Sequence, residues 1–315
     1  MSSLASLRYL VALSEHQHFA RAAQACHITQ PALSNALKAL EQEFGTAIVK
    51  RGRTYAGLTP EGERVLASAQ RMLHEQALLK QDLASTAEQP RGPLVIGVVP
   101  TAAPLAARFA AQLQARHPGI SPVVRSLSSR HIEEGLESLA LDLGLGFAER
   151  LSAGAWAQRL DLLAQCTEHY FLVRRAAQPE AQLRLGAPMR WADAAELPLC
   201  LLTPEMHNRS LVDSAFAQAG VQVQPVMETN SMLTLTLCVQ TAHLASVLPG
   251  ALVGAVRSQG ELEALPLVEP EMLTPLAFAS WRQARPSRAL QAALAMAGQP
   301  QWLAHAAAHS GVLRA

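Results

Sequence analysis

Residues 19–41 read FARAAQACHITQPALSNALKALE, and this stretch predicts two short helices joined by a tight turn. The first helix carries one narrow apolar stripe at helical spacing, formed by Phe19, Ala22, Ala23 and Cys26. The second is expected to begin after Thr29, because threonine is a good N-cap and Pro31 is tolerated only in a helix's first turn. Its own apolar stripe consists of Leu33, Ala36, Leu37 and Leu40. Such a pair forms a helix-turn-helix, whose second helix can lie in the major groove of DNA.

The polar face of the second helix carries residue types that suit DNA. Its members are Gln30, Ser34, Asn35, Lys38 and Gln42. Amides and hydroxyls match base edges, and lysine matches phosphate oxygens. A solvated helix surface has the same composition, so this face by itself leaves both interpretations open.

A longer set of residues resembles the winged helix-turn-helix of the LysR-type transcriptional regulators. The matching runs are Phe19-x-Arg21-Ala22-Ala23, residues 28–34, and Leu37-x-x-Leu40-Glu41, with residues 7–10 before them and residues 57–62 after them. The resemblance implies a DNA-binding domain over residues 1–60. It implies DNA contacts by Thr29, Gln30, Pro31, Ser34, Asn35 and Lys38.

The basic residues of the first 60 positions outnumber the acidic ones by six to three, although the whole chain has a net charge of only +1. Three of them lie in Lys50-Arg51-Gly52-Arg53, between two short apolar segments at residues 47–49 and 55–58. This pattern predicts a wing, a two-stranded arm over the phosphate backbone or minor groove, with Arg51 and Arg53 as DNA contacts. A solvated run of charge is the alternative.

A long helix is predicted over residues 61–88. Thr59 and Pro60 mark its start, and no Gly or Pro interrupts the sequence from Glu63 to Thr86. Apolar residues seven positions apart predict a short coiled-coil seam, at Val65, Leu66, Met72, Leu73 and Leu79. The resemblance implies that this linker helix forms a homodimer, and that two dimers pair into a homotetramer, on pseudo-palindromic DNA. A helix packed only on its own domain is the alternative.

Beyond a hinge at residues 89–92, alternating strands and helices predict an α/β fold with a parallel sheet. The resemblance implies an effector-binding domain over residues 93–300, with two lobes of periplasmic-binding-protein type. Crossovers between the lobes are expected near residues 161–164 and 265–268. Lobe I then holds residues 93–162 and 267–300, and lobe II holds residues 163–266. Residues 301–315 form a C-terminal helical extension whose role the sequence does not indicate.

Four strand-to-helix junctions carry hydroxyl or amide residues, where free helix N–H groups can bind an anion. If the fold brings them around one cleft, they predict a pocket for a small polar or anionic metabolite; taken singly, each is also explained as an ordinary helix cap. Arg209 is a further source of charge near this site. The candidate effector-binding residues are Pro100, Thr101, Ala102, Ser128, Ser129, Phe147, Thr203, His207, Asn230, Ser231 and Pro249.

Residues 129–133 and 206–209 also resemble, more loosely, a LysR-type branch found beside formate-dehydrogenase genes, which makes formate a candidate effector. The peroxide-sensing members of the family carry a reactive cysteine in the region where this chain has Met206-His207-Asn208. The four cysteines, at positions 26, 166, 200 and 238, show no CxxC spacing and are predicted to be buried thiols.

Several function classes lack their motifs. There is no Walker A motif and no nucleophile elbow, Gly144-x-Gly146 lacks the third glycine of a dinucleotide site, and His305 and His309 lack further metal ligands nearby. We therefore predict no enzyme activity, no cofactor and no metal. No run reaches membrane-spanning length and no signal region precedes the first helix, so a cytoplasmic protein without a membrane partner is expected.

The leading hypothesis is a transcription factor whose DNA affinity changes when an effector closes its two lobes. The first alternative is a metabolite-binding module whose N-terminal domain has no DNA-binding role. The second is an enzyme, for example a transferase, on the same α/β scaffold.

Overall fold

The computed structural model describes residues 3–50, 52, 55–85, 89–241, 243–282 and 286–313. It divides into two compact units, the first comprising residues 1–86 and 137–140 and the second comprising residues 87–136 and 141–315. Within the described part of the chain, no helix is both long enough and apolar enough to cross a membrane.

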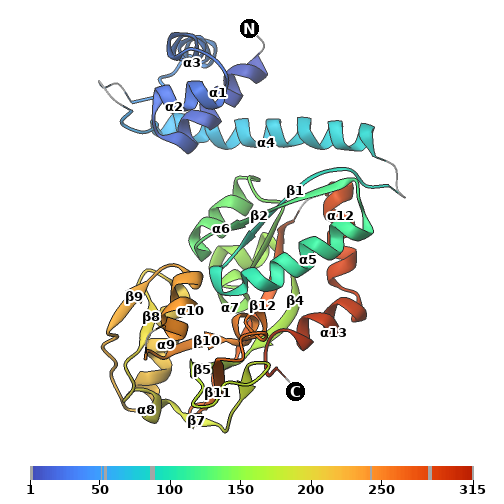
Figure 1. Cartoon of the computed structure of the whole chain (residues 1–315). Coiled ribbons are helices and arrows are strands. Elements are labelled where there is room, and N and C mark those ends of the chain that lie inside the picture. The colour runs from blue at the N-terminus through green and yellow to red at the C-terminus, as the bar shows by residue number, and fades with distance from the viewer. Residues whose placement is uncertain are drawn as a thin grey trace. The chain divides into compact units, whose positions relative to one another are not determined.

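The first unit is a helical domain followed by one long helix (Figure 1). Its elements are α1 (Ser3–His16), α2 (Phe19–Ala25), α3 (Gln30–Phe44) and α4 (Pro60–Ala84). The core draws side chains from every helix, among them Leu10, Leu13, Ala22, Leu33, Leu37, Leu40 and Leu66. The predicted helix-turn-helix is confirmed as α2 and α3.

Local capping explains where these helices begin and end. The hydroxyl of Thr29 accepts the N–H of Ala32 at 3.4 Å, and α3 ends at Gly45, whose φ of 65° is a conformation that glycine adopts without strain. The hydroxyl of Thr59 accepts the N–H of Gly62 at 2.9 Å and caps α4. An added Cβ at Gly62 would lie 2.1 Å from the carbonyl oxygen of Ile48, so this close approach requires glycine.

The predicted wing strands are wrong in extent. The segments at residues 47–49 and 55–58 form one antiparallel bridge, between Val49 and Leu58, in the part of the wing that the structure describes. The pairing stops at Thr59, whose N–H donates to the carbonyl of Ile48 but whose own carbonyl accepts the N–H of Glu63 in α4, so the Ile48 N–H donates to Glu41 instead. Arg51 and Arg53 lie outside the described residues.

The apolar stripe of α4 is divided between two environments. Leu66 and Ala69 are buried in the core of the first unit, which matches the alternative of a helix packed on its own domain. Met72, Leu79 and Leu83 are 52%, 60% and 81% exposed, so the second half of the stripe still presents apolar surface. The helix ends at Ala84, four residues before the predicted end.

The second unit contains two five-strand sheets, one in each lobe (Figure 1). The first has the order β2-β1-β3-β12-β4, with β1 (Gly92–Val98), β2 (Ile120–Ser126), β3 (Leu143–Phe147), β4 (Leu160–Glu168) and β12 (Thr274–Trp281). β1 runs parallel to β2 and β3, but β12 runs antiparallel to β3 and β4, so the predicted parallel sheet is in fact mixed. Its helical segments are η1 (Pro100–Ala102), α5 (Ala103–Arg116), α6 (Ser129–Glu137), α7 (Ala148–Leu151), η2 (Gly154–Gln158), α12 (Arg288–Ala297) and α13 (Pro300–Ala308).

The second sheet has the order β10-β5-β11-β6, with β7 also paired to β11. Its strands are β5 (Tyr170–Arg175), β6 (Arg184–Leu185), β7 (Met189–Arg190), β10 (Ser246–Pro249) and β11 (Leu262–Val268). A separate pair is formed by β8 (Cys200–Leu202) and β9 (Met227–Thr229). The helices of this lobe are α8 (Trp191–Ala194), α9 (His207–Gln218), α10 (Met232–Thr241) and α11 (Gly250–Ala255).

Both crossovers lie later in the chain than predicted. β4 pairs with β12 along its whole length, up to the pair of Glu168 with Thr274, so residues 163–168 belong to lobe I. The first crossover is therefore at His169. β11 stays in the second sheet through Val268, which pairs with Arg190, and the second crossover comprises residues 269–273. A strand cannot change lobes while its ladder continues, which is why the pairing moves these limits.

The C-terminal segment connects the two lobes a third time. Trp302 and Ala306 of α13 are buried in the lobe I core, whereas Leu313 is buried in a lobe II core. Between them, Gly311 lies so close to α11 that a Cβ on Gly250 would be 2.2 Å from its carbonyl oxygen. The segment after residue 300 thus packs across the crossovers.

Glu168 is the polar centre of this three-way junction. Its Oε2 accepts the N–H of Ala251 at 3.1 Å and the N–H of Gly311 at 3.0 Å, while Oε1 has no partner in the described structure. Burial raises the pKa of Glu168 to about 7, against the N–H groups of Gly311, Ala251 and Gly250, which lower it. The carboxyl group is only 3% exposed.

We expect the free energy of unfolding of the second unit to depend on pH through Glu168. A raised pKa contributes stability that is fully present below the ordinary value of 4.5 and is lost as pH rises through about 7. Glu168→Gln should remove this loss, so the pH dependence of the two proteins should differ by about 3 kcal/mol across that window. Denaturant unfolding followed by tryptophan fluorescence measures it, since all four tryptophans lie after residue 150. The exposed control Glu271→Gln should follow the wild type; parallel wild-type and Glu168→Gln profiles would contradict the assignment.

Candidate functional site

The first candidate site is the outer face of α3. Burial of Leu33, Leu37 and Leu40 on one side of the helix turns Gln30, Asn35 and Lys38 to solvent, and leaves Ser34 half-buried at the edge. Thr29 and Pro31 are exposed in the first turn, where the Thr29 hydroxyl also serves as the cap. The six residues of this segment that were predicted to contact DNA therefore lie either in the first turn of α3 or on its outer face.

A groove of about 760 Å³ runs between this face and the segment that follows α3. Ser34, Lys38 and Gln42 line one wall, and residues 45–47, 49, 50 and 52 line the other. Lys50 is exposed on the second wall, so the groove has an exposed cation on each side. A polyanion is the ligand that such a pair of cations attracts.

Glu41 joins the two walls of the groove. Its Oε1 accepts the backbone N–H groups of Ile48 at 2.8 Å and Val49 at 3.1 Å. On the other side of the same segment, the Thr59 hydroxyl donates to the carbonyl of Ala47 at 2.6 Å. The start of the wing is thus held at a set distance from α3. Sequence reasoning missed this role, although Glu41 stands in a matched family motif.

The second candidate site is a cleft of about 410 Å³ between the two lobes. Lobe I contributes Thr101, Ser128, Ser129 and Phe147, and lobe II contributes His207. The other lining residues are Val99, Pro100, Arg130, His131, Arg150, Glu205, Met206, Asn208 and Ser210. Its volume falls in the range of sites that bind small molecules.

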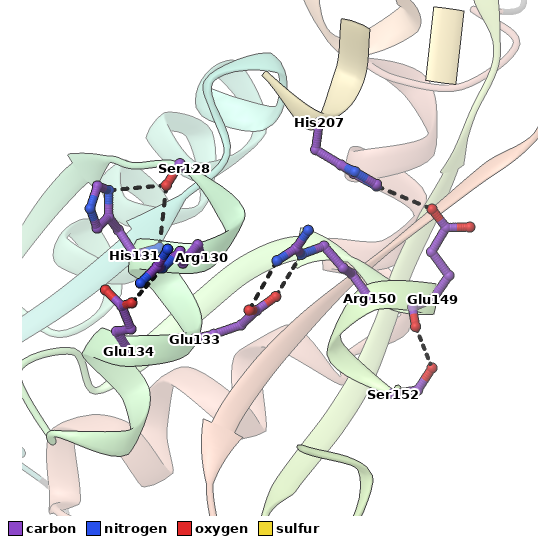
Figure 2. Close-up of polar contacts among 9 residues, drawn as sticks. All are labelled: Ser128, Arg130, His131, Glu133, Glu134, Glu149, Arg150, Ser152 and His207. Atoms are coloured by element: carbon purple, nitrogen blue, oxygen red, sulfur yellow. Dashed lines mark hydrogen bonds and ion pairs between the residues drawn. The ribbon is translucent and has the colours of Figure 1, made fainter. Parts of the chain in front are cut away.

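A polar contact between His207 and Glu149 spans the cleft. His207 Nε2 at the start of α9 lies 3.3 Å from Glu149 Oε1 on α7 of the opposite lobe, as Figure 2 shows. The His207 ring also packs edge-on against Phe147, with 4.9 Å between ring centroids. His207 is therefore the side chain through which the two lobes meet at this site.

The lobe I wall of the cleft is polar and internally paired (Figure 2). Arg150 makes two hydrogen bonds to the buried Glu133, at 2.7 and 3.1 Å, and this contact raises the pKa of Arg150 further above its ordinary value. Ser128 Oγ lies 3.0 Å from His131 Nδ1. These pairs orient the wall residues before any ligand binds.

Two helices begin at the cleft from opposite lobes, α6 at Ser129 and α9 at His207. No side chain caps α9, whose N-cap position is Met206. Helix N-termini carry N–H groups and a partial positive charge, so the cleft suits a ligand with anionic or acceptor oxygens.

The structure brings six of the predicted effector residues to this cleft, Pro100, Thr101, Ser128, Ser129, Phe147 and His207. The other predictions are corrected as follows. Ala102 and Pro249 are buried and are not among the residues that line it, and Thr203 donates to Glu205 at 2.7 Å. Asn230 and Ser231 line a neighbouring groove, which shares Pro100 with the cleft.

Arg209 does not face the cleft either. Its guanidinium binds Asp213, Glu228 and the carbonyl of Leu202, at distances between 2.5 and 2.8 Å, and its side chain is only 9% exposed. Arg209 therefore holds α9, β8 and β9 together. His305 and His309 lie on α13 and its cap, with the rings 4.4 Å apart.

Sequence reasoning missed several cleft residues. They are Arg130, His131, Glu149, Arg150, Met206 and Asn208. Glu149 and Arg150 lie in α7, which follows β3 directly, at a strand-to-helix junction that the sequence analysis did not include. Asn208 is buried and donates to the hydroxyl of Tyr170 at 2.8 Å, a contact across 38 positions that no local pattern reveals.

The thiols are poorly placed for nucleophilic chemistry. Burial raises the pKa of Cys166 to about 12 and that of Cys200 to about 11. No cysteine is among the described residues that line the cleft. In the region where the peroxide-sensing members of the family carry a reactive cysteine, this chain therefore has His207 and no thiol.

Two family descriptions match this chain. "LysR substrate binding domain" matches residues 87–300, and "Bacterial regulatory helix-turn-helix protein, lysR family" matches residues 4–63. The DNA-binding transcriptional dual regulator OxyR of Escherichia coli (strain K12) is 28% identical over 274 residues, which cover 85% of this chain and 86% of that protein. The hydrogen peroxide-inducible genes activator of Haemophilus influenzae is 33% identical over 144 residues, or 45% of this chain and 48% of that protein.

Solved structures show the same architecture. A full-length OxyR variant from Pseudomonas aeruginosa has 26% identity and a TM-score of 0.65, with 99% of each chain covered. Full-length CbnR complexed with its target DNA has 18% identity and a TM-score of 0.65, with 98% of this chain and 100% of that chain covered, and so shares the fold. The names of these proteins give no support to the expected link with formate dehydrogenase genes.

Loss of the Glu41 anchor should loosen the wing. Glu41→Ala leaves the N–H groups of Ile48 and Val49 without their acceptor, and we expect DNA affinity to fall by about tenfold as the wing loses its position. The matched control is Glu43→Ala, which removes the same charge from an exposed position two residues away. Fluorescence anisotropy with operator DNA measures both. Equal affinities for the two variants would show that charge, and not the anchor, matters.

Proposed function

This chain belongs to the LysR family of DNA-binding transcriptional regulators, and we propose that it reads promoter DNA with α3 as a dimer and responds to a small anion held between its lobes. It is a regulator and not an enzyme. The alternative of a module without a DNA-binding role is not supported, because the helix-turn-helix description matches residues 4–63.

The observation that carries the proposal is the outward polar face of α3 beside an anchored wing. We assign base contacts to Gln30, Ser34 and Asn35, which offer amides and a hydroxyl to base edges. We assign phosphate contacts to Lys38, Thr29 and the turn around Pro31. Arg51 and Arg53 remain predictions from the sequence, as extensions of the wing that begins at Lys50.

A second copy of the chain fits the exposed half of α4. Met72, Leu79 and Leu83 project apolar side chains at positions seven and four residues apart, on one face of the helix. Pairing of two such faces would bury these side chains and would present two α3 helices to the half-sites of a pseudo-palindrome. Association of two dimers into a tetramer is a further prediction that rests on the family. DNA as target places this activity in the cytoplasm.

The interlobe cleft supports a small organic anion as effector. An anion between α6 and α9 would meet two helix N-termini and the hydroxyls of Thr101 and Ser128. It would also compete with Glu149 for His207, which is how a ligand would alter the contact between the lobes. Formate belongs to this class, but its three heavy atoms would occupy a small part of 410 Å³, so the cleft favours a larger acid.

A polar chain leads from the cleft to the crossovers. Asn208 follows His207 and donates to the hydroxyl of Tyr170, which also accepts the hydroxyl of Thr274 at 3.3 Å. Tyr170 is the first residue after the first crossover, and Thr274 is the first residue after the second. A ligand that moves α9 would therefore act directly on both crossovers. The size of the response is limited by the difference in ligand affinity between the two lobe arrangements.

Substitutions on α3 should separate base reading from phosphate binding. Gln30→Ala should relax base preference, at a cost of about 1–3 kcal/mol for the preferred operator. Lys38→Ala should weaken binding to all sequences and reduce the salt slope by about one. Footprinting and salt titration distinguish these effects, with Gln218→Ala in the second unit as control. Unchanged protection in both α3 variants would refute the assignment of this face.

Charge on the exposed stripe of α4 should prevent dimerisation. Leu79→Glu would place like charges in the proposed seam, whereas Lys80→Glu changes the neighbouring exposed residue on another face. Sedimentation velocity should show a monomer only for Leu79→Glu, and its operator affinity should fall because the two half-sites are no longer linked. A dimer in Leu79→Glu would place the interface elsewhere.

A small-anion ligand should raise the melting temperature of the wild type but not of His207→Ala. The panel should include formate, acetate and di- and tricarboxylates, because binding to the folded state stabilises by about 2.7 kcal/mol at 100 times Kd. His243→Ala, which alters an exposed histidine outside the cleft, should respond like the wild type. A shift that persists in His207→Ala would mean that the anion binds outside this cleft.

A further inference from the structure

Three sulfur-bearing side chains far apart in the sequence meet in lobe II, outside the cleft. Cys200 opens β8 and Met227 opens β9, and the two residues are directly paired in the parallel β8–β9 ladder. Paired residues on neighbouring strands project to the same side of a sheet. Cys238 lies on α10, two turns from its first residue.

Cys238 is the centre of this group. Its thiol donates to the Met227 thioether with 3.3 Å between the sulfur atoms. Cys200 and Cys238 both pack in the same apolar core of lobe II, together with Leu202 and Leu235. The three sulfur-bearing side chains therefore gather in one place, supplied by three different elements.

The three sulfur-bearing side chains differ in their exposure to solvent. Cys200 is fully buried, Cys238 is half-buried, and Met227 is 37% exposed. Arg209 binds both Leu202 of β8 and Glu228 of β9, so the strands that carry two of the sulfur atoms are already held together. The three positions are thus organised without a ligand.

We propose that Cys200, Cys238 and Met227 bind a soft monovalent metal ion, Cu(I), through their three sulfur atoms. Thiolate and thioether are the ligands that Cu(I) prefers, and a three-sulfur set suits a low-coordinate ion. Zinc fits less well, because its structural sites have four ligands drawn from Cys, His and carboxylate. Among the described residues no three His, Cys, Asp or Glu side chains gather in a metal-binding group, so no harder ligand completes such a site.

Binding would proceed without a change of oxidation state. Cu(I) forms bonds to the two Cys sulfur atoms and the Met sulfur atom, and the two thiol protons pass to the buffer. A disulfide between Cys200 and Cys238 is the competing chemistry.

The bound ion would tie α10 to the strand that leads into the effector cleft. β8 runs from Cys200 to Leu202, and four residues later the chain reaches Met206 at the cleft wall. The site would therefore stiffen one wall of the effector cleft. It stands independently of the proposed anion, because none of its three residues lines that cleft.

The test is a titration of the full-length reduced chain with Cu(I) under anaerobic conditions, against a chromogenic Cu(I) chelator, with native mass spectrometry to count bound ions. One ion per chain should be retained in the wild type. Cys238→Ser should lose it, and Met227→Leu should bind it about tenfold more weakly. The matched controls Cys166→Ser and Met189→Leu, which alter a thiol and a thioether elsewhere, should retain it.

Circular dichroism should show that each variant is folded. Cys238 is partly exposed whereas Cys200 is buried, so Cys238→Ser is the milder of the two possible substitutions at the thiols of the site. Two results would overturn the proposal. One is a Cu(I) affinity that Cys238→Ser leaves unchanged, which would place any bound metal on other sulfur atoms. The other is the absence of a chelator-resistant ion in the wild type, whether the thiols stay reduced or are found joined as a disulfide.

Discussion

An α-helix of 15 residues has one face left for a partner once its other face is buried, and the DNA-binding surface of this chain follows from that limit. Leu33, Leu37 and Leu40 pack into the core of the first unit. Turning the polar face inward would expose them, at about 1.5–3 kcal/mol for each side chain. The polar residues on the opposite face are therefore held outward by hydrophobic burial. Glu41 extends this order to the wing, because its carboxylate accepts the backbone N–H groups of Ile48 and Val49.

In the second unit, the main structural constraint is the connection between the two lobes, which must hold them together and still let them move relative to each other. Two crossovers and the C-terminal segment pass between the sheets, and they are tied by a few buried polar groups, chiefly Glu168 and Tyr170. Such contacts are directional and few, unlike the extensive apolar cores within each lobe. A displacement of one hydrogen-bond partner, such as Asn208 at the cleft, would therefore alter the hydrogen bonds at the crossovers. The contact of Glu149 with His207 is a further polar link between the lobes.

The comparison with OxyR distinguishes the fold, which the two proteins share, from the side chains that line the cleft of this chain. The two chains share the family and the architecture, yet the cleft of this chain presents His207 and Met206, and its described lining includes no thiol. The thiols of Cys166 and Cys200 have raised pKa values because they are buried. A fold of this kind supports many ligands, so the response of this regulator has to be argued from its own side chains. Reversible binding of an anion, in place of thiol oxidation, is the proposal that these side chains support.

The sequence alone determined the features that depend on neighbours in the chain. Helical period and the caps Thr29 and Thr59 are local interactions, so α2, α3 and α4 could be predicted together with the outward face of α3. Only the tertiary structure decided which distant residues meet. The pairing of β4 with β12 moved the first crossover to His169, and the folded chain placed Asn230 and Ser231 in a groove next to the cleft. The β8–β9 sheet brought Cys200, Met227 and Cys238 together across 38 positions, because packing joins residues whose spacing in the chain carries no signal.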